Sequence, residues 1–320
     1  MKVIRVQTRG YLLVVVTATF WGFSGNLAKF LMKGDITPFA LTQARSLVTA
    51  AVLLVYLLAT NPSTLRLTRA TAPWAVAFGL SLAATQVCYF SAIERLNVAA
   101  AILLEYLAPA IVVAYSWLFL RRAMTKTTLG SLISVLVGSA LVVKAYDPAA
   151  LSLSASGVAF GLGAAIAFSA YILIGEHLQA LGTGVATQLF YGFTVTTVLL
   201  MAIRPPWRAA PETFEPSNLM LLAVVGILGT LLPFACFFAS LRYIDAGRAT
   251  IVSTLEPVVA GMVAFAWLGE RFAGMQLVGA ALIIGAIVAL QRTDSGRGEI
   301  VMPLEVVGFS EETVDDLSRA

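Results

Sequence analysis

The sequence predicts an all-α membrane protein with ten transmembrane helices, arranged as two inverted five-helix repeats around a central cavity. Three observations lead to this prediction: the apolar composition, the regular recurrence of long apolar runs, and a match of the chain with itself. Hydrophobic residues make up 59% of the 320 residues, charged residues 12%, and the mean hydropathy is +0.89. A soluble domain of this size does not bury that much apolar surface, so the lipid bilayer is the expected surrounding.

Apolar runs of about 20 residues, the length that crosses the hydrocarbon core of a bilayer, recur along the chain with short connections between them. The first run follows Lys2, Arg5 and Arg9, but it is too long for the apolar region of a signal peptide, so we expect a retained first span. The expected spans are 10–32, 38–59, 72–92, 98–119, 127–145, 156–177, 183–203, 217–240, 246–268 and 273–291.

The chain matches itself when it is shifted by 148 residues, because Cys88 then falls on Cys236 and Pro109 on Pro257. A second register, shifted by 145, places Thr42–Gln43 on Thr187–Gln188. We therefore expect two copies of one unit, 1–146 and 147–291. With five spans in each copy, an odd number, the second copy is inverted relative to the first. Inverted repeats are how many secondary transporters build two access states around a central site.

Positive residues predict the orientation of the spans. If the N-terminus is inside, the cytoplasmic segments hold twelve Lys and Arg residues and the other side six, which favours both termini in the cytoplasm of an inner-membrane protein. Beyond position 291 the composition becomes polar and acidic, so 292–320 is expected to be a disordered cytoplasmic tail.

Several classes of function are disfavoured by the composition. The formal charge of +4 comes from short basic loops, with no basic stripe for a nucleic acid. The chain has a single histidine, His177, no metal-ligand spacing and no glycine-rich nucleotide loop. We therefore expect no enzyme activity, metal or cofactor, and an ion or solute gradient as the energy source.

Two motifs in equivalent places resemble a known family. Leu255-Glu256-Pro257-Val258-Val259 is followed by Trp267-Leu268-Gly269-Glu270-Arg271, and Leu104-Glu105-Tyr106-Leu107-Ala108-Pro109 has the same place in the first half. This succession resembles the EamA-type members of the drug/metabolite transporter superfamily. The resemblance covers all ten expected spans and implies transport of a small molecule, while the cargo stays open among amino acids, other metabolites and toxic compounds.

Ionisable side chains inside a span are costly and are expected to face the interior of the bundle. Lys29, Arg45, Glu105 and Glu256 are the candidates. Arg45 and Glu105 enter from the same side and lie at equal depth, about 10–12 Å below the surface from the helical rise. Equal depth permits a contact between them, either as a salt bridge that only joins two spans or as a charged wall of the substrate cavity.

Two prolines at equivalent positions predict breaks in the fourth and ninth spans. Proline cannot donate to the carbonyl four residues earlier, so Pro109 frees the backbone oxygen of Glu105 and Pro257 that of Ser253. Matched breaks near the middle of the membrane point to a transporter site, and the alternative is a kink needed only for the shape of the bundle.

Glu256 lies near the middle of its span, where it is either a protonatable group that couples substrate to H⁺ or a structural acceptor. Other polar residues that can turn inward are Gln86 and Tyr89. The residues expected to bind substrate are Arg45, Glu105, Tyr106, Gln43, Asn26, Gln188, Trp21, Tyr171 and Glu256.

The sequence therefore predicts a secondary transporter, an exporter of small metabolites with amino acids favoured, because Arg45 and Glu105 together suit a zwitterion. An exporter of cationic drugs is the alternative within the same class. A lipid-modifying membrane enzyme and a receptor that binds without transport are the alternatives from other classes.

Overall fold

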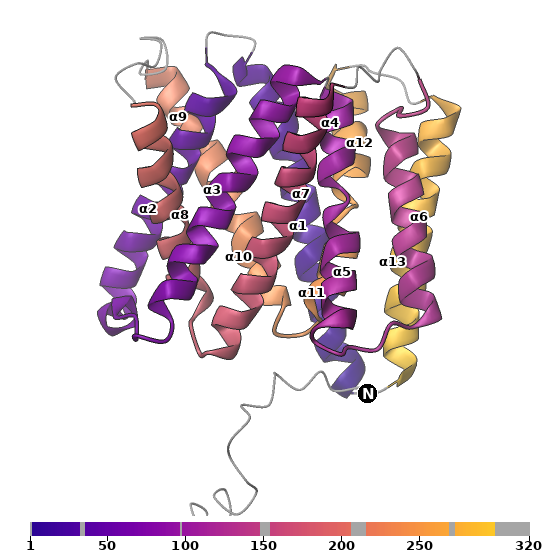
Figure 1. Cartoon of the computed structure of the whole chain (residues 1–320), viewed down its shortest axis with the longest axis horizontal. Coiled ribbons are helices and arrows are strands. Elements are labelled where there is room, and N and C mark those ends of the chain that lie inside the picture. Colours follow the sequence, from indigo (N-terminus) through magenta and orange to yellow (C-terminus); the bar gives the residue numbers. More distant parts are fainter. Residues whose placement is uncertain are drawn as a thin grey trace, which may run out of the picture.

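A computed structural model describes residues 2–32, 36–96, 98–147, 154–205, 216–268 and 273–297. Over these ranges the chain forms helices that run up and down between two faces, and no strand (Figure 1). The helix α1 begins at the same end of the bundle at which α13 ends; we call this end the N-terminal face and the other the opposite face. The elements are α1 (Lys2–Met32), α2 (Pro38–Thr60), η1 (Pro62–Leu65), α3 (Ala72–Arg95), α4 (Val98–Glu105), α5 (Ala108–Leu118), α6 (Lys126–Val142), α7 (Ala155–Ala180), α8 (Val185–Ile203), α9 (Pro216–Gly226), η5 (Ile227–Leu231), α10 (Leu232–Ser240), α11 (Ala246–Ser253), α12 (Glu256–Leu268) and α13 (Gly274–Arg297).

Polar caps fix where several of these helices begin. The side chains of Thr37, Thr125 and Ser154 each accept a hydrogen bond from the backbone N–H three residues later, which satisfies one of the free donors of a helix start. Pro38 occupies the first turn of α2, where the missing N–H costs nothing.

Nine helical stretches of the described residues are long and apolar enough to cross a membrane, and some of them join two helices across a break. A further apolar helix, α6, is only 17 residues long, so it is shorter than the span expected at 127–145. It ends early because Lys144 adopts a left-handed conformation (φ 60°). The N–H of Ala145 then bonds to the carbonyl of Ala140, and the N–H of Lys144 to that of Leu141, a C-terminal cap that stops the helix.

The helix α13 continues to Arg297, beyond the boundary expected at 291. The acidic residues of the expected tail after Arg297 lie outside the described residues.

Small residues let helices approach closely. The helices α6 and α13 form a pair at one side of the bundle (Figure 1) and cross at Gly138 and Gly279, where a Cβ on either glycine would lie within 2.7 Å of the backbone oxygen of the other. Side chains join the same two helices, because Gln276 donates to the carbonyl of Val142 and Ser131 to that of Ala286. Close contacts through glycine and hydrogen bonds to backbone oxygens are typical of helix packing in membranes.

Candidate functional site

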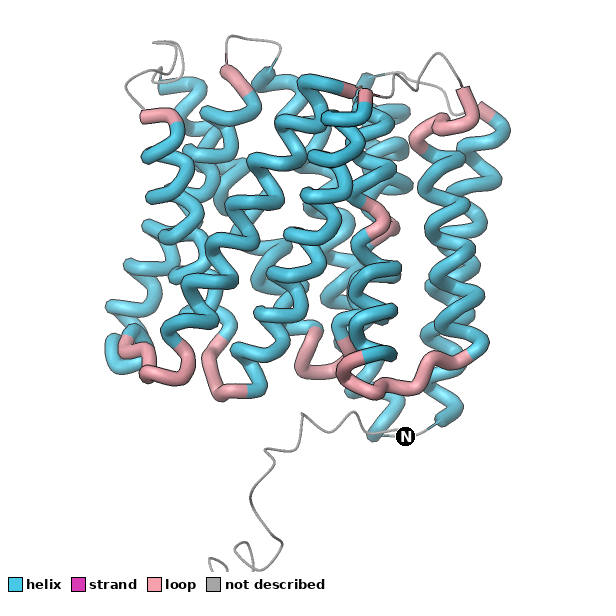
Figure 2. The backbone as a smooth tube through the Cα atoms, in the orientation of Figure 1, coloured by secondary structure: helices cyan, strands magenta, loops and turns pink. Residues whose placement is uncertain are grey.

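The chain leaves the helical conformation at both positions that the prolines indicate. The helices α4 and α5 are separated by Tyr106 and Leu107, and the helices α11 and α12 by Thr254 and Leu255. Figure 2 shows a short loop inside the bundle, between the two faces, where helix gives way to turn. After each break the first N–H groups bond to the second turn residue: Ala110 and Ile111 to the carbonyl of Leu107, and Val258 and Val259 to that of Leu255.

The two broken helices cross the bundle in opposite directions. The helices α4 and α12 lie on the opposite face, whereas α5 and α11 lie on the N-terminal face (Figure 1). Pro109 and Pro257 each follow the break by two residues, and neither has an N–H to give to the carbonyl four residues earlier. The interior of the bundle therefore has backbone polar groups near mid-depth that a continuous helix would have used.

Three charged side chains gather around these breaks. Arg45 of α2 interacts electrostatically with Glu105, the last residue of α4, and with Glu256, the first residue of α12. The two carboxylates also interact with one another. Arg45, Glu105 and Glu256 are all partly buried. The two breaks and the second span thus contribute to one charged group, which we call the charge cluster.

Tyrosines surround the charge cluster. Tyr89 of α3 and Tyr171 of α7 each interact with Arg45 and with both carboxylates, and Tyr106 in the first break interacts with Glu105 and Glu256. A guanidinium, two carboxylates and phenolic hydroxyls offer donors and acceptors to a ligand that carries charges of both signs.

The expected pair of Arg45 and Glu105 does not form. No ion pair joins Arg45 to either carboxylate, although all three side chains belong to the described residues. The helix α2 packs against α8 and α9, while α4 packs against α7 and α3. Equal depth fixes the height of two residues in a bundle, but the lateral position of each span follows from packing, which depth does not determine.

Trp21 and Tyr171 belong to an aromatic cluster. The Trp21 ring lies 5.3 Å from Phe234 and 5.9 Å from Phe237, and the Tyr171 ring lies 6.1 Å from Phe78 and 6.3 Å from Phe238. Offset and edge-on contacts at these distances are favourable. The rings come from α1, α3, α7 and α10 and form part of the main buried core.

Asn26 and Gln43 join helices to one another. The Asn26 side chain donates to the carbonyls of Gly22 and Ala260, each at 3.0 Å, and so ties α1 to α12. The Gln43 side chain donates to the carbonyls of Leu200 and Arg204 and ties α2 to the end of α8. The amide nitrogens of both residues donate to backbone oxygens and so join helices. The sequence did not distinguish this structural role from substrate binding.

Gln188 differs from Gln43, its equivalent in the duplicated sequence. It is fully buried, and neither its amide nitrogen nor its amide oxygen has a hydrogen-bond partner. A Cβ placed on Gly175 would lie 2.5 Å from the Gln188 amide nitrogen and 2.3 Å from Cε1 of Phe238, so α7, α8 and α10 meet here. An unbonded buried amide is costly.

Tyr89, which the sequence indicated only as a polar residue that can turn inward, belongs to the tyrosines around the charge cluster. One feature escaped the sequence reasoning. The π-helical segment η5 lies in the middle of the stretch Asn218–Ser240, and Pro233, two residues after its end, lacks the N–H for a regular α-helical bond. Proline inside an apolar run was the available signal. Lys29 was also a candidate, and its side chain lies outside the described residues.

No three His, Cys, Asp or Glu residues gather as a metal site within the described ranges.

The EamA-like transporter family model matches the chain twice, over residues 8–144 and 155–292. The chain is 26% identical over 296 residues to the uncharacterized inner membrane transporter YicL of Salmonella typhimurium, covering 90% of this chain and 97% of that protein. It is 28% identical to the pseudopaline exporter CntI of Pseudomonas aeruginosa, covering 76% and 83%. It is 32% identical to a probable terminal-alkyne amino-acid exporter of Streptantibioticus cattleyicolor, covering 61% and 64%.

A crystal structure of another protein has the same fold. It superposes with a TM-score of 0.77 at 19% sequence identity and covers 90% of this chain and 98% of its own. The apolar helices, the two family matches and the transporters among the relatives agree with one another. The chain is a multi-pass membrane protein that belongs to the EamA-like transporter family.

Proposed function

We propose that the protein is a secondary exporter of small metabolites, with amino acids as the favoured substrates, and that it works by alternating access. The observation that carries this proposal is the charge cluster, in which Arg45 interacts with Glu105 and Glu256 at the two helix breaks. A basic and two acidic groups that interact without forming an ion pair suit the carboxylate and the ammonium group of an amino acid. The substrate class of a related protein, the probable amino-acid exporter, agrees with this choice.

The proposed architecture is ten spans in two inverted repeats, 1–146 and 147–291. The two family matches and the opposed breaks support it, and α6 is counted as a short tenth span. Both termini lie on the cytoplasmic side of an inner membrane. The excess of basic residues on the N-terminal face supports this orientation.

Binding of substrate is assigned to the charge cluster, to Tyr106 and Tyr171, and to Gln188, whose unbonded amide is available to a polar group. Asn26, Gln43 and Trp21 contribute by holding the helices that carry these residues. Glu256 is the candidate for coupling to protons because it begins α12 at the second break. We assign no role in substrate binding to the tail, 292–320, or to the junction of the two repeats at 146.

A cationic drug is the alternative substrate, favoured by the two carboxylates against one guanidinium in the charge cluster. Flux into proteoliposomes of the purified full-length chain separates the two, with a panel of zwitterionic amino acids and permanently cationic compounds. We expect saturable uptake of amino acids that unlabelled amino acids inhibit. Uptake of the cations alone would favour the drug exporter, and binding of either class without flux would indicate a receptor.

A further inference from the structure

One carboxylate on the N-terminal face holds two separate parts of the chain. The Glu176 Oε1 atom, near the end of α7, accepts a hydrogen bond from the Arg122 guanidinium at 3.0 Å and from the Ala246 backbone N–H at 3.2 Å. Arg122 lies in the connection from α5 to α6, and Ala246 is the first residue of α11. The Glu176 side chain is 12% exposed and that of Arg122 is 27% exposed, so this ion pair is shielded more than a surface pair.

Each of these two parts adjoins a half-helix on the N-terminal face: the connection that holds Arg122 follows α5, and Ala246 begins α11. The helix α5 begins after the break at Tyr106–Leu107, and α11 ends at the break at Thr254–Leu255. Each half-helix is therefore joined to its partner half by turn residues rather than by a continuous helix. Element-terminal residues of this kind absorb the backbone rotation in hinge motions.

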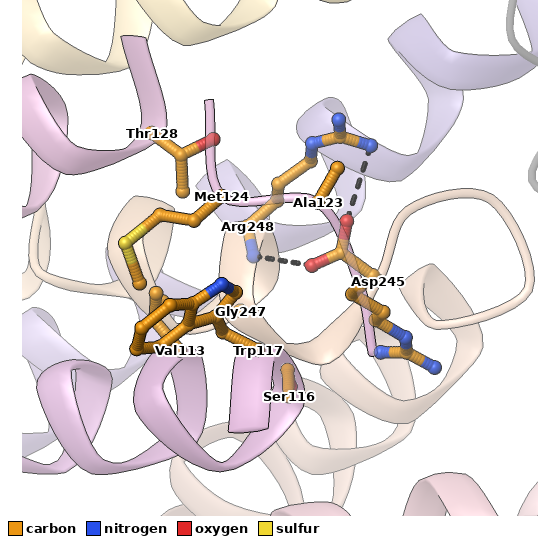
Figure 3. A pocket seen from close by; sticks show the side chains of 10 residues that line it. Val113, Ser116, Trp117, Ala123, Met124, Thr128, Asp245, Gly247 and Arg248 are labelled. Atoms are coloured by element: carbon orange, nitrogen blue, oxygen red, sulfur yellow. Dashed lines mark hydrogen bonds and ion pairs between the residues drawn. The ribbon is translucent and has the colours of Figure 1, made fainter. Parts of the chain in front are cut away.

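The half-helices α5 and α11 are packed tightly against one another beside Glu176. A Cβ on Gly247 would lie 3.2 Å from the Cγ2 of Val113, which is buried. The cavity next to this seam is drawn in Figure 3 and is lined by residues that include Val113, Met124 and Arg248. Its volume is about 40 Å³. At Gly247 and Val113 the two half-helices are in contact and leave no room for even a methyl group without a shift.

The sequence does not repeat the Glu176–Arg122 pair at the equivalent positions of the two halves. The position equivalent to Glu176 is Leu31 in the register of 145, and the position equivalent to Arg122 is Glu270 in the register of 148. A leucine and a glutamate cannot form an ion pair with one another. The Glu176–Arg122 pair is therefore a difference between the two halves of the sequence.

We propose that Glu176 is the latch of a gate on the N-terminal face, formed by the half-helices α5 and α11. While Glu176 holds Arg122 and Ala246, both half-helices stay against α7 and this face is closed. Release of the carboxylate lets them move about the breaks at Tyr106–Leu107 and Thr254–Leu255. The proposal rests on alternating access as the proposed function, but the latch itself is testable without a known substrate.

The test measures access to the seam between α5 and α11. A reporter cysteine, Val113→Cys, is placed in a background with Cys88→Ser and Cys236→Ser, and its alkylation by a small hydrophilic maleimide is timed in the purified full-length chain. We expect Glu176→Ala to raise the alkylation rate about tenfold, because loss of both hydrogen bonds favours local opening. Glu176→Gln keeps an acceptor oxygen and is expected to restore part of the slow rate.

The matched control is Asp245→Asn. Asp245 forms an ion pair with Arg248 at 3.1 Å on the same face, but both residues belong to the start of α11, so this pair joins no two elements (Figure 3). Asparagine also retains the oxygen that caps the Arg248 N–H. Asp245→Asn is expected to leave the alkylation rate unchanged.

Arg122→Gln tests the latch independently of any change at Glu176, because it removes the ion pair and leaves Glu176 bonded to Ala246. Folding is followed by gel filtration and melting temperature. Rapid alkylation in folded Glu176→Ala or Arg122→Gln, with a slow control, supports the latch. An unchanged rate in these variants, an equal rise in Asp245→Asn, or failure of both variants to fold would overturn it in favour of a structural ion pair. Loss of flux without a change in alkylation would count against the latch and leave the proposed function standing.

Discussion

Gln43 and Gln188 occupy equivalent positions in the duplicated sequence, yet the Gln43 amide donates to the carbonyls of Leu200 in α8 and of Arg204 directly after it, and the Gln188 amide has no partner. Both side chains are buried. The same residue type thus joins two helices in one half of the chain and is left unbonded in the other half.

Replacement of each glutamine by leucine is expected to have opposite effects on stability. Gln43→Leu removes both hydrogen bonds between α2 and α8 and lowers the free energy of unfolding by about 1 kcal/mol, the usual size of such bonds in membranes. Gln188→Leu removes an unbonded buried amide, so the melting temperature stays the same or rises. Melting temperatures of the two purified variants, measured in one detergent, check this.

Flux separates the two roles further. If Gln188 binds substrate, Gln188→Leu loses transport without loss of stability. A variant that is as stable as the parent and transports normally would remove Gln188 from the site.

The close approach of α1 to α12 is expected to depend on Gly22. A Cβ at this position would lie 2.8 Å from the backbone oxygen of Glu256 and 2.8 Å from the backbone nitrogen of Ala260. Gly22→Ala must therefore separate α1 from α12 and weaken the bond from Asn26 to Ala260. We expect a lower melting temperature and a change in transport, because Glu256 begins the displaced helix.

Gly25 is the matched control for this experiment. It lies on the same helix one turn away, and a Cβ there meets nothing within 4 Å. Gly25→Ala is expected to be neutral or slightly stabilising, since alanine favours a helix over glycine by about 1 kcal/mol. Equal losses in both variants would contradict a specific contact at Gly22.

The cytoplasmic position of the termini is tested by labelling. Ser295→Cys, in a background that lacks Cys88 and Cys236, introduces a thiol near the end of α13. An impermeant maleimide is expected to leave this thiol unmodified in intact cells and to modify it after permeabilisation. Modification in intact cells would reverse the assigned orientation.

Much of the fold follows directly from the sequence, because apolar length and proline position act locally. Pro109 and Pro257 lie in the first turn after each break, as expected from their missing N–H groups. The length of α6 was harder to predict, since its end depends on the left-handed conformation of Lys144, which glycine usually adopts.

The interior position of the charged side chains was predictable, but their contacts were not. Arg45, Glu105 and Glu256 were expected in the interior because charges are costly in lipid, and they do interact there. The partners of Asn26 and Gln43 are backbone oxygens of helices that lie far away in sequence. Only the packing of the spans decides which carbonyl a buried amide reaches, and no local pattern encodes it.

The latch at Glu176 shows the same limit. Glu176 lies at the end of an apolar span, where a carboxylate has no need of a buried partner. Its contacts with Arg122 and Ala246 come from elements 54 and 70 residues away. The three-dimensional arrangement of α5, α7 and α11 was needed to find it.

The central claim is that the charge cluster binds the transported molecule, and the most direct test is flux with Arg45 and Glu105 replaced together. No ion pair joins these two described residues, although they interact electrostatically. Arg45→Met with Glu105→Leu removes one positive and one negative charge from the interior, so the net charge of the charge cluster stays the same. Glu256 keeps its carboxyl group in this variant.

The measurement is saturable uptake of the amino acid found in the flux panel, by proteoliposomes of the double variant and of the parent at equal protein content and comparable melting temperature. The account predicts a folded variant that has lost uptake of the charged substrate. A folded double variant with the uptake of the parent would contradict it.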